Sequence, residues 1–238
     1  MSMHNATVII LGGSSGIGLA TAQAVQAAGA KVVITGRDAA RLENARVALG
    51  GNADARQLDA ADEAGTRELF AGLPAIDHVF ITAGQLVLDG KLAPATASLH
   101  PALDTRFWGA LYAAKYAAPK IRPGGSITFM SGTASRRPLP GASVATASCG
   151  AVDAFARALA LDLAPIRVNT IQPGYTDTPL FDGIFGDQRD AVLAAAGAKL
   201  PVGRIGRPDE IAHAVLFLMT NGYVTGINLV VDGGGLLV

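Results

Sequence analysis

The sequence predicts an α/β protein, with a doubly wound parallel sheet and helices on both faces, in three layers. Three observations support this fold class. Short apolar runs alternate with segments of helical spacing from one end of the chain to the other. A glycine-rich turn joins the first apolar run to the first helical segment. Hydrophobic residues make up 50% of the chain and charged residues 16%, which suits a sheet that is buried on both faces.

The expected strands are short, continuous apolar runs, which is the pattern of strands covered on both sides. They are the ranges 6–11, 31–35, 78–82, 125–130, 166–172 and 227–231. Helical spacing fills the intervals between several of them, and a parallel connection needs such a crossover. The strands are therefore expected to run parallel to one another.

The expected helices are 18–30, 38–49, 100–118, 143–163 and 208–220. The last of these opens with Pro208, Asp209 and Glu210, residues that suit a helix start. The range 175–205 has the least regular pattern, and we expect a lid-like insertion there. No linker or internal repeat divides the chain, so a single domain over residues 1–238 is predicted.

Composition argues against several classes of partner. The net charge is +0 and no block of Lys or Arg occurs, so neither nucleic acid nor a membrane surface is an expected partner. No unbroken apolar run approaches the length of a membrane span, and the N-terminus lacks the pattern of a signal peptide. The single cysteine, Cys149, excludes an internal disulfide and fits a reducing compartment, so a cytoplasmic protein is expected. The histidines lack metal-ligand spacing, and no metal site is predicted.

The glycine-rich turn reads GGSSGIG and places glycines at 12, 13, 16 and 18, between a strand and a helix. Glycines allow the backbone to turn tightly and to approach a pyrophosphate, and the helix N-terminus presents free N–H groups to it. The alternative is a turn that merely packs a strand on a helix. The position of the turn after the first strand favours phosphate binding.

The G-x-x-x-G-x-G spacing resembles that of the short-chain dehydrogenase/reductases, usually written T-G-x-x-x-G-x-G, with Leu11 in the Thr place. ITAG at 81–84 is similar to the N-N-A-G of that family, with both Asn places changed. Further similar stretches are IRVNTIQPGYTDTPL, GRIGRPDEIAHAVLFL and VTGINLVVDGG. The resemblance spans nearly the whole chain and implies a single Rossmann-type dinucleotide-binding domain.

The residues after the second strand favour NADP(H) over NAD(H). A carboxylate at this place would take the ribose hydroxyls of NAD, whereas Gly36 leaves room and Arg37 offers a planar cation suited to phosphate. Asp38 is interpreted as a helix cap, and the alternative for Arg37 is a solvated surface charge. The predicted cofactor contacts, which rest on the resemblance, are Gly12, Ser14, Ser15, Gly16, Ile17, Gly18, Arg37, Asp59, Ala83, Gly84, Pro173, Gly174 and Thr178.

The resemblance also implies a catalytic set of Tyr, Lys, Ser and Asn, and the sequence departs from it. When the AV at 151–152 is matched to the family pattern, the Lys, Tyr, Ser and Asn places hold Cys149, Ala145, Gly132 and Arg106. No Tyr occurs between 117 and 174 and no Lys between 121 and 198, so no gap placement restores the pair. The remaining Y-x-x-x-K, YAAPK at 116–120, precedes the strand at 125–130 and is interpreted as a coincidence of helical spacing.

Three functional hypotheses follow. The first is an NADP(H)-dependent oxidoreductase that acts on a small carbonyl or alcohol through an atypical site, with candidates Ser131, Thr133, Tyr175 and Arg106. Arg106 has the alternative of a structural ion pair or an interface contact. The second is a non-catalytic NADP(H)-binding sensor or regulatory subunit. The third and weaker hypothesis is an isomerase or lyase with a structural cofactor.

The resemblance further implies self-association. Members of the family usually pair through the helices that correspond to 100–118 and 143–163, so a homodimer or homotetramer is expected. The C-terminal GGGLLV is expected to extend such an interface.

Overall fold

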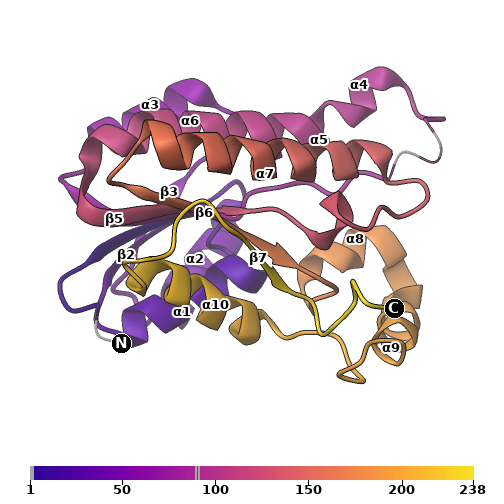
Figure 1. Ribbon diagram of the computed structural model, residues 1–238. Helices are drawn as coiled ribbons and strands as arrows, with labels where there is room; N and C mark the ends of the chain where they lie inside the picture. The colour runs from indigo at the N-terminus through magenta and orange to yellow at the C-terminus, as the bar shows by residue number, and fades with distance from the viewer. Residues whose placement is uncertain (1–2, 89, 91) are drawn as a thin grey trace.

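The computed structural model describes residues 3–88, 90 and 92–238 and contains one sheet of seven parallel strands (Figure 1). The strand order is β3-β2-β1-β4-β5-β6-β7. The strands are β1 (Thr7–Leu11), β2 (Lys31–Gly36), β3 (Asp54–Gln57), β4 (Ile76–Ile81), β5 (Ile121–Met130), β6 (Arg167–Pro173) and β7 (Asn228–Val231). The predicted fold class is confirmed.

Helices cover both faces of the sheet (Figure 1). One face carries α1 (Gly16–Ala27), α2 (Ala39–Ala48) and α10 (Pro208–Thr220). The other carries α3 (Glu63–Ala71), α6 (Gly109–Ala117) and α7 (Ser143–Asp162). A short run formed by α4 (Thr96–Leu99), α5 (Pro101–Leu103) and the π-helical turn Asp104–Trp108 leads into α6.

Two hydrophobic layers hold these parts together, because successive side chains of a strand point to opposite faces. In β1, Val8 and Ile10 pack under α1 and α10, while Ile9 and Leu11 pack under α3 and α6. All of these side chains are fully buried. The continuous apolar runs of the sequence are thus explained by burial on both faces.

Some elements differ from the predicted ones. The edge strand β3 and the helix α3 were not predicted, because β3 reads DARQ and is only partly buried, so it lacks an apolar run. β5 begins at Ile121 rather than 125. The range 175–205 is largely helical, with two 3₁₀ turns (Pro179–Phe181 and Gly186–Gln188), α8 (Asp182–Phe185) and α9 (Arg189–Gly197). By length and composition α7 would be able to cross a membrane, but one of its faces packs on β6 and β5.

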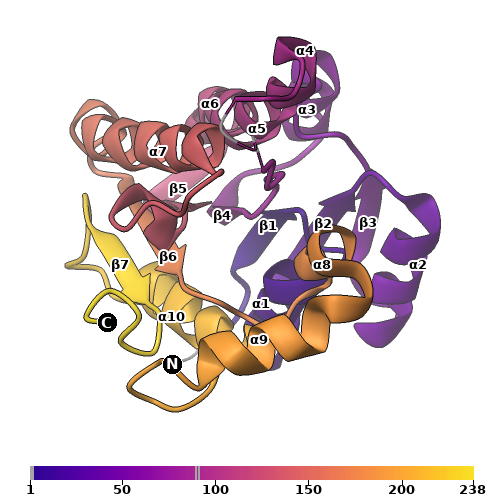
Figure 2. The same ribbon diagram turned by 90° about the vertical axis from the view of Figure 1, so that its right-hand side faces the viewer.

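The strand order reverses between β1 and β4, the place where open α/β sheets bind ligands beyond the carboxyl ends of their strands. Figure 2 looks toward this edge and shows α8 and α9 on one side of the strand ends, with α4 and α5 on the other. The fold therefore places the loops after β1, β4, β5 and β6 around one opening.

Candidate active site

A cleft of about 1170 Å³ lies at this edge of the sheet. Its walls come from the loops after β1, β2, β4, β5 and β6, from the α8–α9 lid and from the C-terminal segment. Every residue that was predicted to contact the cofactor lines this cleft, as do the catalytic candidates Arg106, Ser131, Thr133 and Tyr175. The sequence motifs are thereby brought together in one place.

The glycine turn forms one wall, and its glycines are required by close backbone contacts. A Cβ at Gly18 would lie 2.1 Å from the carbonyl oxygen of Gly12, and Gly12 itself has a φ of +94°. The N-cap residue of α1, Ser15, makes no side-chain capping bond, and the first turn of α1 carries no acidic residue. The N–H groups at the start of α1 are therefore directed at the cleft without a competing anion.

Thr82 contributes to this wall and was not among the predicted residues. Its hydroxyl donates to the carbonyl of Gly12 at 3.0 Å, and its N–H donates to Leu11 O at 2.8 Å. Thr82 stands in one of the changed Asn places of the ITAG stretch. The sequence signal for this role was a short polar side chain directly after the β4 strand. The structure shows that this side chain ties the end of β4 to the glycine turn.

The far end of the cleft carries two arginines and two carboxylates, and Arg41 pairs with Asp38 at 3.8 Å. Arg37 and Arg41 both line it, and within the described ranges no carboxylate lies within 4.0 Å of the Arg37 guanidinium. A Cβ at Gly36 would lie 2.8 Å from Ser14 Oγ, so a side chain there would require Ser14 to move. Asp38 caps α2 by accepting from Arg41 N at 3.0 Å, as predicted.

These residues fit NADP(H). The uncapped helix and the glycine turn suit a pyrophosphate, and the unpaired Arg37 with nearby Arg41 suits a 2′-phosphate. Asp59 lies beside them, with its carboxylate accepting from Ala61 N at 3.0 Å. Sequence reasoning missed Arg41, although it lies one helical turn beyond Arg37.

Arg106 lines the cleft and is buried. It belongs to the π-helical turn, a feature common at functional sites, and only 8% of the residue is exposed. Its Nη1 donates long contacts to the carbonyls of Met130 at 3.4 Å and Ser131 at 3.5 Å. A Cβ at Gly84 would lie 3.0 Å from its Cζ.

The charge of Arg106 has no counter-ion in the described part of the chain, where no carboxylate lies within 4.0 Å of it. Its buried Nε has no hydrogen-bond partner there either. Arg106 therefore forms no structural ion pair within the described residues, and a buried cation without a counter-ion is costly. The alternative of an interface contact stays a prediction. The side chain is available to an anion or oxyanion in the cleft.

Ser131 and Thr133 follow β5 and bond to the protein backbone. Ser131 Oγ donates to Cys149 O at 3.2 Å, and Thr133 Oγ1 donates to Pro173 O at 3.4 Å. These contacts tie the loop after β5 to α7 and to the end of β6, while both residues line the cleft. Behind this loop Gln172 Nε2 donates to Ser135 Oγ at 3.0 Å and to the buried carboxylate of Asp153 at 2.6 Å, a support that sequence reasoning missed.

The loop faces α7 through small residues. A Cβ at Gly132 would lie 3.5 Å from Cys149 Sγ, and both residues line the cleft. Ala145 is buried on the same helix and does not line it. The helix α7 contains neither Tyr nor Lys.

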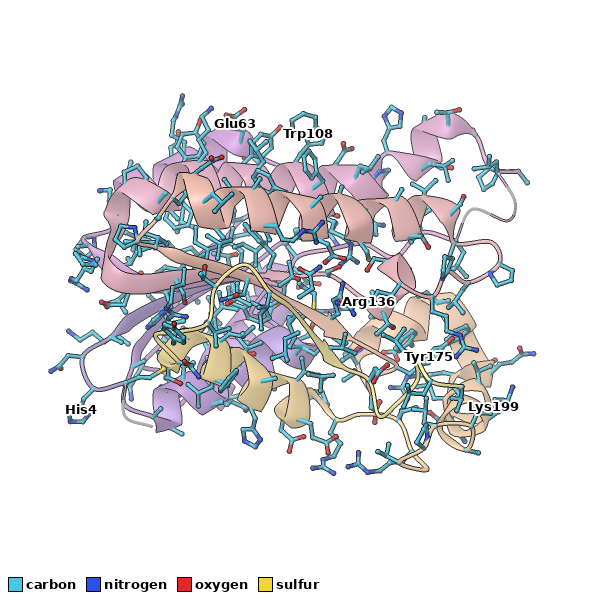
Figure 3. All side chains as sticks on the ribbon, viewed as in Figure 1. His4, Glu63, Trp108, Arg136, Tyr175 and Lys199 are labelled. Atoms are coloured by element: carbon cyan, nitrogen blue, oxygen red, sulfur yellow. The ribbon has the colours of Figure 1, made fainter. Side chains whose placement is uncertain are left out.

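The lid carries the aromatic candidate Tyr175, whose ring centroid lies 5.7 Å from that of Phe181, which stacks in turn on Phe185 at 5.6 Å. Figure 3 shows Tyr175 and Lys199 at the same end of the molecule. At the base of the lid, Thr178 lies close to the glycine turn, because a Cβ at Gly16 would lie 3.2 Å from Thr178 Cγ2.

Tyr116 and Lys120 lie outside the cleft. Tyr116 OH donates to Glu63 Oε1 at 2.8 Å, and Lys120 Nζ donates to Leu73 O at 3.0 Å. Both side chains pack toward α3 and the segment after it. The interpretation of YAAPK as a coincidence of spacing is therefore confirmed by its position.

Comparison with known proteins agrees with this geometry. Residues 12–235 match the family model described as enoyl-(acyl carrier protein) reductase. The short-chain dehydrogenase/reductase malC of Malbranchea aurantiaca is 35% identical over 255 residues, covering 99% of this chain and 96% of that one. The NADP-dependent (R)-specific alcohol dehydrogenase of Lentilactobacillus kefiri is 34% identical over 241 residues, covering 95% and 94%.

A solved structure of a small-chain dehydrogenase in complex with NADPH superposes with a TM-score of 0.83 at 34% identity and covers 98% of this chain and 100% of that one. The glycine turn, the unpaired Arg37 and these likenesses support the same cofactor, NADP(H). The chain belongs to the short-chain dehydrogenase/reductase family.

Proposed function

We propose that the protein is an NADPH-dependent reductase of a conjugated carbonyl compound and that Arg106, rather than a tyrosine, stabilises the charge that develops on the substrate. The buried guanidinium of Arg106, which has no counter-ion in the described part of the chain, is the observation that carries this proposal. It lines the same cleft as the glycine turn and Arg37.

We further propose that the usual catalytic set of the family is lost here. Gly132, Ala145 and Cys149 stand in the Ser, Tyr and Lys places of the resemblance. None of these residues carries the phenol or the ammonium group of the family's catalytic set. General acid catalysis contributes roughly 10²–10⁴-fold in rate. A site without a general acid therefore needs a substrate whose reduction does not require a strong acid.

Arg106 is suited to such a substrate. When NADPH is bound, its reduced nicotinamide supplies a hydride. A cation held in a buried site stabilises an oxyanion without reorganisation, because the protein has already taken it out of water. Arg106 donates a long contact to Ser131 O, and Ser131 donates to Cys149 O, which supports a role for this cation near the position that stands for the family's Lys.

The chemistry favours a carbon–carbon double bond conjugated to the carbonyl. The β-carbon of the substrate accepts the hydride, the π electrons of the C=C bond move toward the carbonyl, and the negative charge comes to rest on the oxygen beside Arg106. Water then gives a proton to the α-carbon, so the product gains two hydrogens. An enolate is a far weaker base than an alkoxide, so this path needs no strong acid. The matched family description also names reduction of an enoyl group.

The test is NADPH consumption with paired substrates, such as cyclohexenone with cyclohexanone and cinnamaldehyde with benzaldehyde. The proposal predicts turnover of the conjugated member of each pair and a saturated carbonyl product. Arg106→Gln is expected to lower kcat by about 10²–10³-fold, and Arg106→Lys by less. Tyr175→Phe, which keeps the ring of the lid, should change kcat little. Reduction at the carbonyl carbon, or an unchanged rate in Arg106→Gln, would overturn the proposal.

Binding without turnover of any carbonyl, together with a cofactor-dependent change in assembly, would instead favour the sensor hypothesis. We also propose that the chain pairs with a second copy through α6 and α7. The support is the family resemblance and the apolar residues on their outer faces, where Trp108 and Leu161 are exposed.

A further inference from the structure

The end of the cleft remote from Arg37 is apolar, and its mouth carries exposed hydrophobic side chains. Leu88, Leu139, Leu180 and Val238 all line the cleft, and each is about half exposed. They come from different places in the chain: the loop after β4, the loop after β5, the lid and the C-terminal segment. Exposed apolar residues that gather around one opening mark a binding surface.

The C-terminal segment, residues 233–238, forms a wall of this apolar end. Leu236 and Val238 line the cleft, whereas Leu237 between them is 84% exposed and does not. The expectation that GGGLLV extends a subunit interface stays a prediction, and Leu237 is the most exposed residue of the segment that such an interface would cover. Substitutions at Leu236 and Leu237 can therefore be compared directly, because Leu236 faces the cleft and its neighbour Leu237 does not.

Two polar residues hold the segment in place. The carboxylate of Asp232 accepts from Gly234 N at 2.9 Å and from Leu236 N at 2.8 Å. Arg137 Nη1 donates to Gly235 O at 2.7 Å and joins the segment to the loop after β5. The segment also contacts the end of the lid, where Val202 N donates to Gly233 O at 3.3 Å. Hydrogen bonds therefore fix this segment as a wall of the cleft.

We infer that this wall sets the length of an extended apolar substituent on the substrate, with Leu236 as the specificity-determining residue. The inference rests on the proposed function, in which the reacting carbonyl lies at Arg106. The apolar body of the substrate then extends from Arg106 past the lid aromatics toward the mouth. The substrate class is a conjugated carbonyl with an alkyl or ring substituent, larger than the small carbonyl that the sequence suggested.

Binding of 4-n-alkylphenols, from methyl to octyl, to the NADP⁺-loaded protein tests this without any turnover. A phenol presents a planar conjugated oxygen to Arg106 and an alkyl chain to the apolar end. Each methylene that is buried should tighten binding by about fourfold, until the chain reaches the mouth and the gain stops. Titration calorimetry measures the series. Affinity that does not depend on chain length would overturn the inference.

The position of the wall is tested by Leu236→Trp with Leu237→Trp as its control. Leu236→Trp should end the gain at a shorter chain, and Leu236→Ala should extend it. Leu237→Trp should leave the series unchanged, and NADPH affinity should be the same in all three variants. An equal effect of Leu236→Trp and Leu237→Trp would refute a role for the wall in the cleft.

The same series as alkyl enones, from 3-penten-2-one upward, separates this inference from the proposed function. If phenols show the length dependence and the enones consume no NADPH, the apolar site stands and the reductase proposal fails. If enones are reduced at rates that ignore chain length and Leu236→Trp, the reductase proposal stands and the wall inference fails.

Discussion

Arg37 is the residue expected to distinguish NADPH from NADH, because its guanidinium offers a cation to the 2′-phosphate. Its guanidinium has no carboxylate partner in the residues that the structure describes, and a side chain at Gly36 would require Ser14 to move. Charge-assisted bonds to phosphate contribute about 1.5–3 kcal/mol. We therefore expect Arg37→Ala to weaken NADPH binding by about 10- to 100-fold and to leave NADH binding nearly unchanged, as measured by fluorescence titration.

Arg157→Ala, at an exposed position on α7 away from the cleft, is the matched control for Arg37→Ala and should alter neither affinity. Equal losses for NADPH and NADH in Arg37→Ala would show that the side chain supports the fold of the cleft rather than the 2′-phosphate.

His78 makes the stability of the fold depend on pH. The pKa of His78 is lowered from 6.5 to about 4, mainly because the side chain is buried and also because of the nearby charge of Arg167, while Asp77 partly opposes the shift. The unfolded chain therefore binds more protons than the folded chain between pH 6.5 and 4. The free energy of unfolding has its full value above pH 6.5. It should fall by about 3 kcal/mol as the pH drops through this window.

His78→Asn removes the titrating group and keeps a polar partner for Ser126, which lies 2.9 Å from His78 Nδ1. Urea unfolding at pH 7 and pH 4.5 should show a smaller loss of stability in the variant than in the wild type. Parallel losses in the two proteins would assign the pH dependence to other groups.

At the scale of elements, the lid depends on Arg189 of α9. Its guanidinium forms ion pairs with Asp177, with Asp182 at 2.7 Å and with Asp190 at 2.8 Å. Asp177 precedes Thr178, which contacts the glycine turn. We expect Arg189→Gln to speed amide hydrogen exchange across 177–197 severalfold and to weaken NADPH binding, while the sheet keeps its protection.

Asp190→Asn is the control for the lid, since the Asp190 side chain is 92% exposed and its pair with Arg189 should add little. If exchange in the lid were the same in the wild type and Arg189→Gln, the lid would be held by its aromatic stack alone.

The sequence was most informative where a motif is local. The glycine turn, Arg37 and the Asp38 cap each lie within a few residues of a strand end, so their roles follow from spacing. β3 was missed because an edge strand need not be apolar. The missing partner of Arg106 and the position of Leu236 depend on segments far apart in the chain, and spacing alone gives neither.

At the scale of the whole molecule, the outer face of α6 and α7 is the surface through which two copies of the chain are proposed to pair. Trp108 stacks on Tyr112 at 6.4 Å and lies on the outer surface (Figure 3), and Leu161 is 82% exposed. If two copies pair through this face, Leu161→Asp should shift the protein to monomers in light scattering and keep NADPH binding. Leu237→Asp, at an exposed leucine elsewhere, should not. A monomeric wild type would contradict the pairing.

The most direct measurement of the proposed chemistry is the single-turnover rate of NADPH oxidation with a conjugated ketone between pH 6 and 11. A tyrosine acid, whose usual pKa is about 10, would impose a titration on this rate in the upper part of the range, whereas an arginine keeps its charge throughout. The proposal predicts a rate that is independent of pH in the wild type and is lost in Arg106→Gln. A rate that follows the titration of a protein acid, or one that survives in Arg106→Gln, would contradict it.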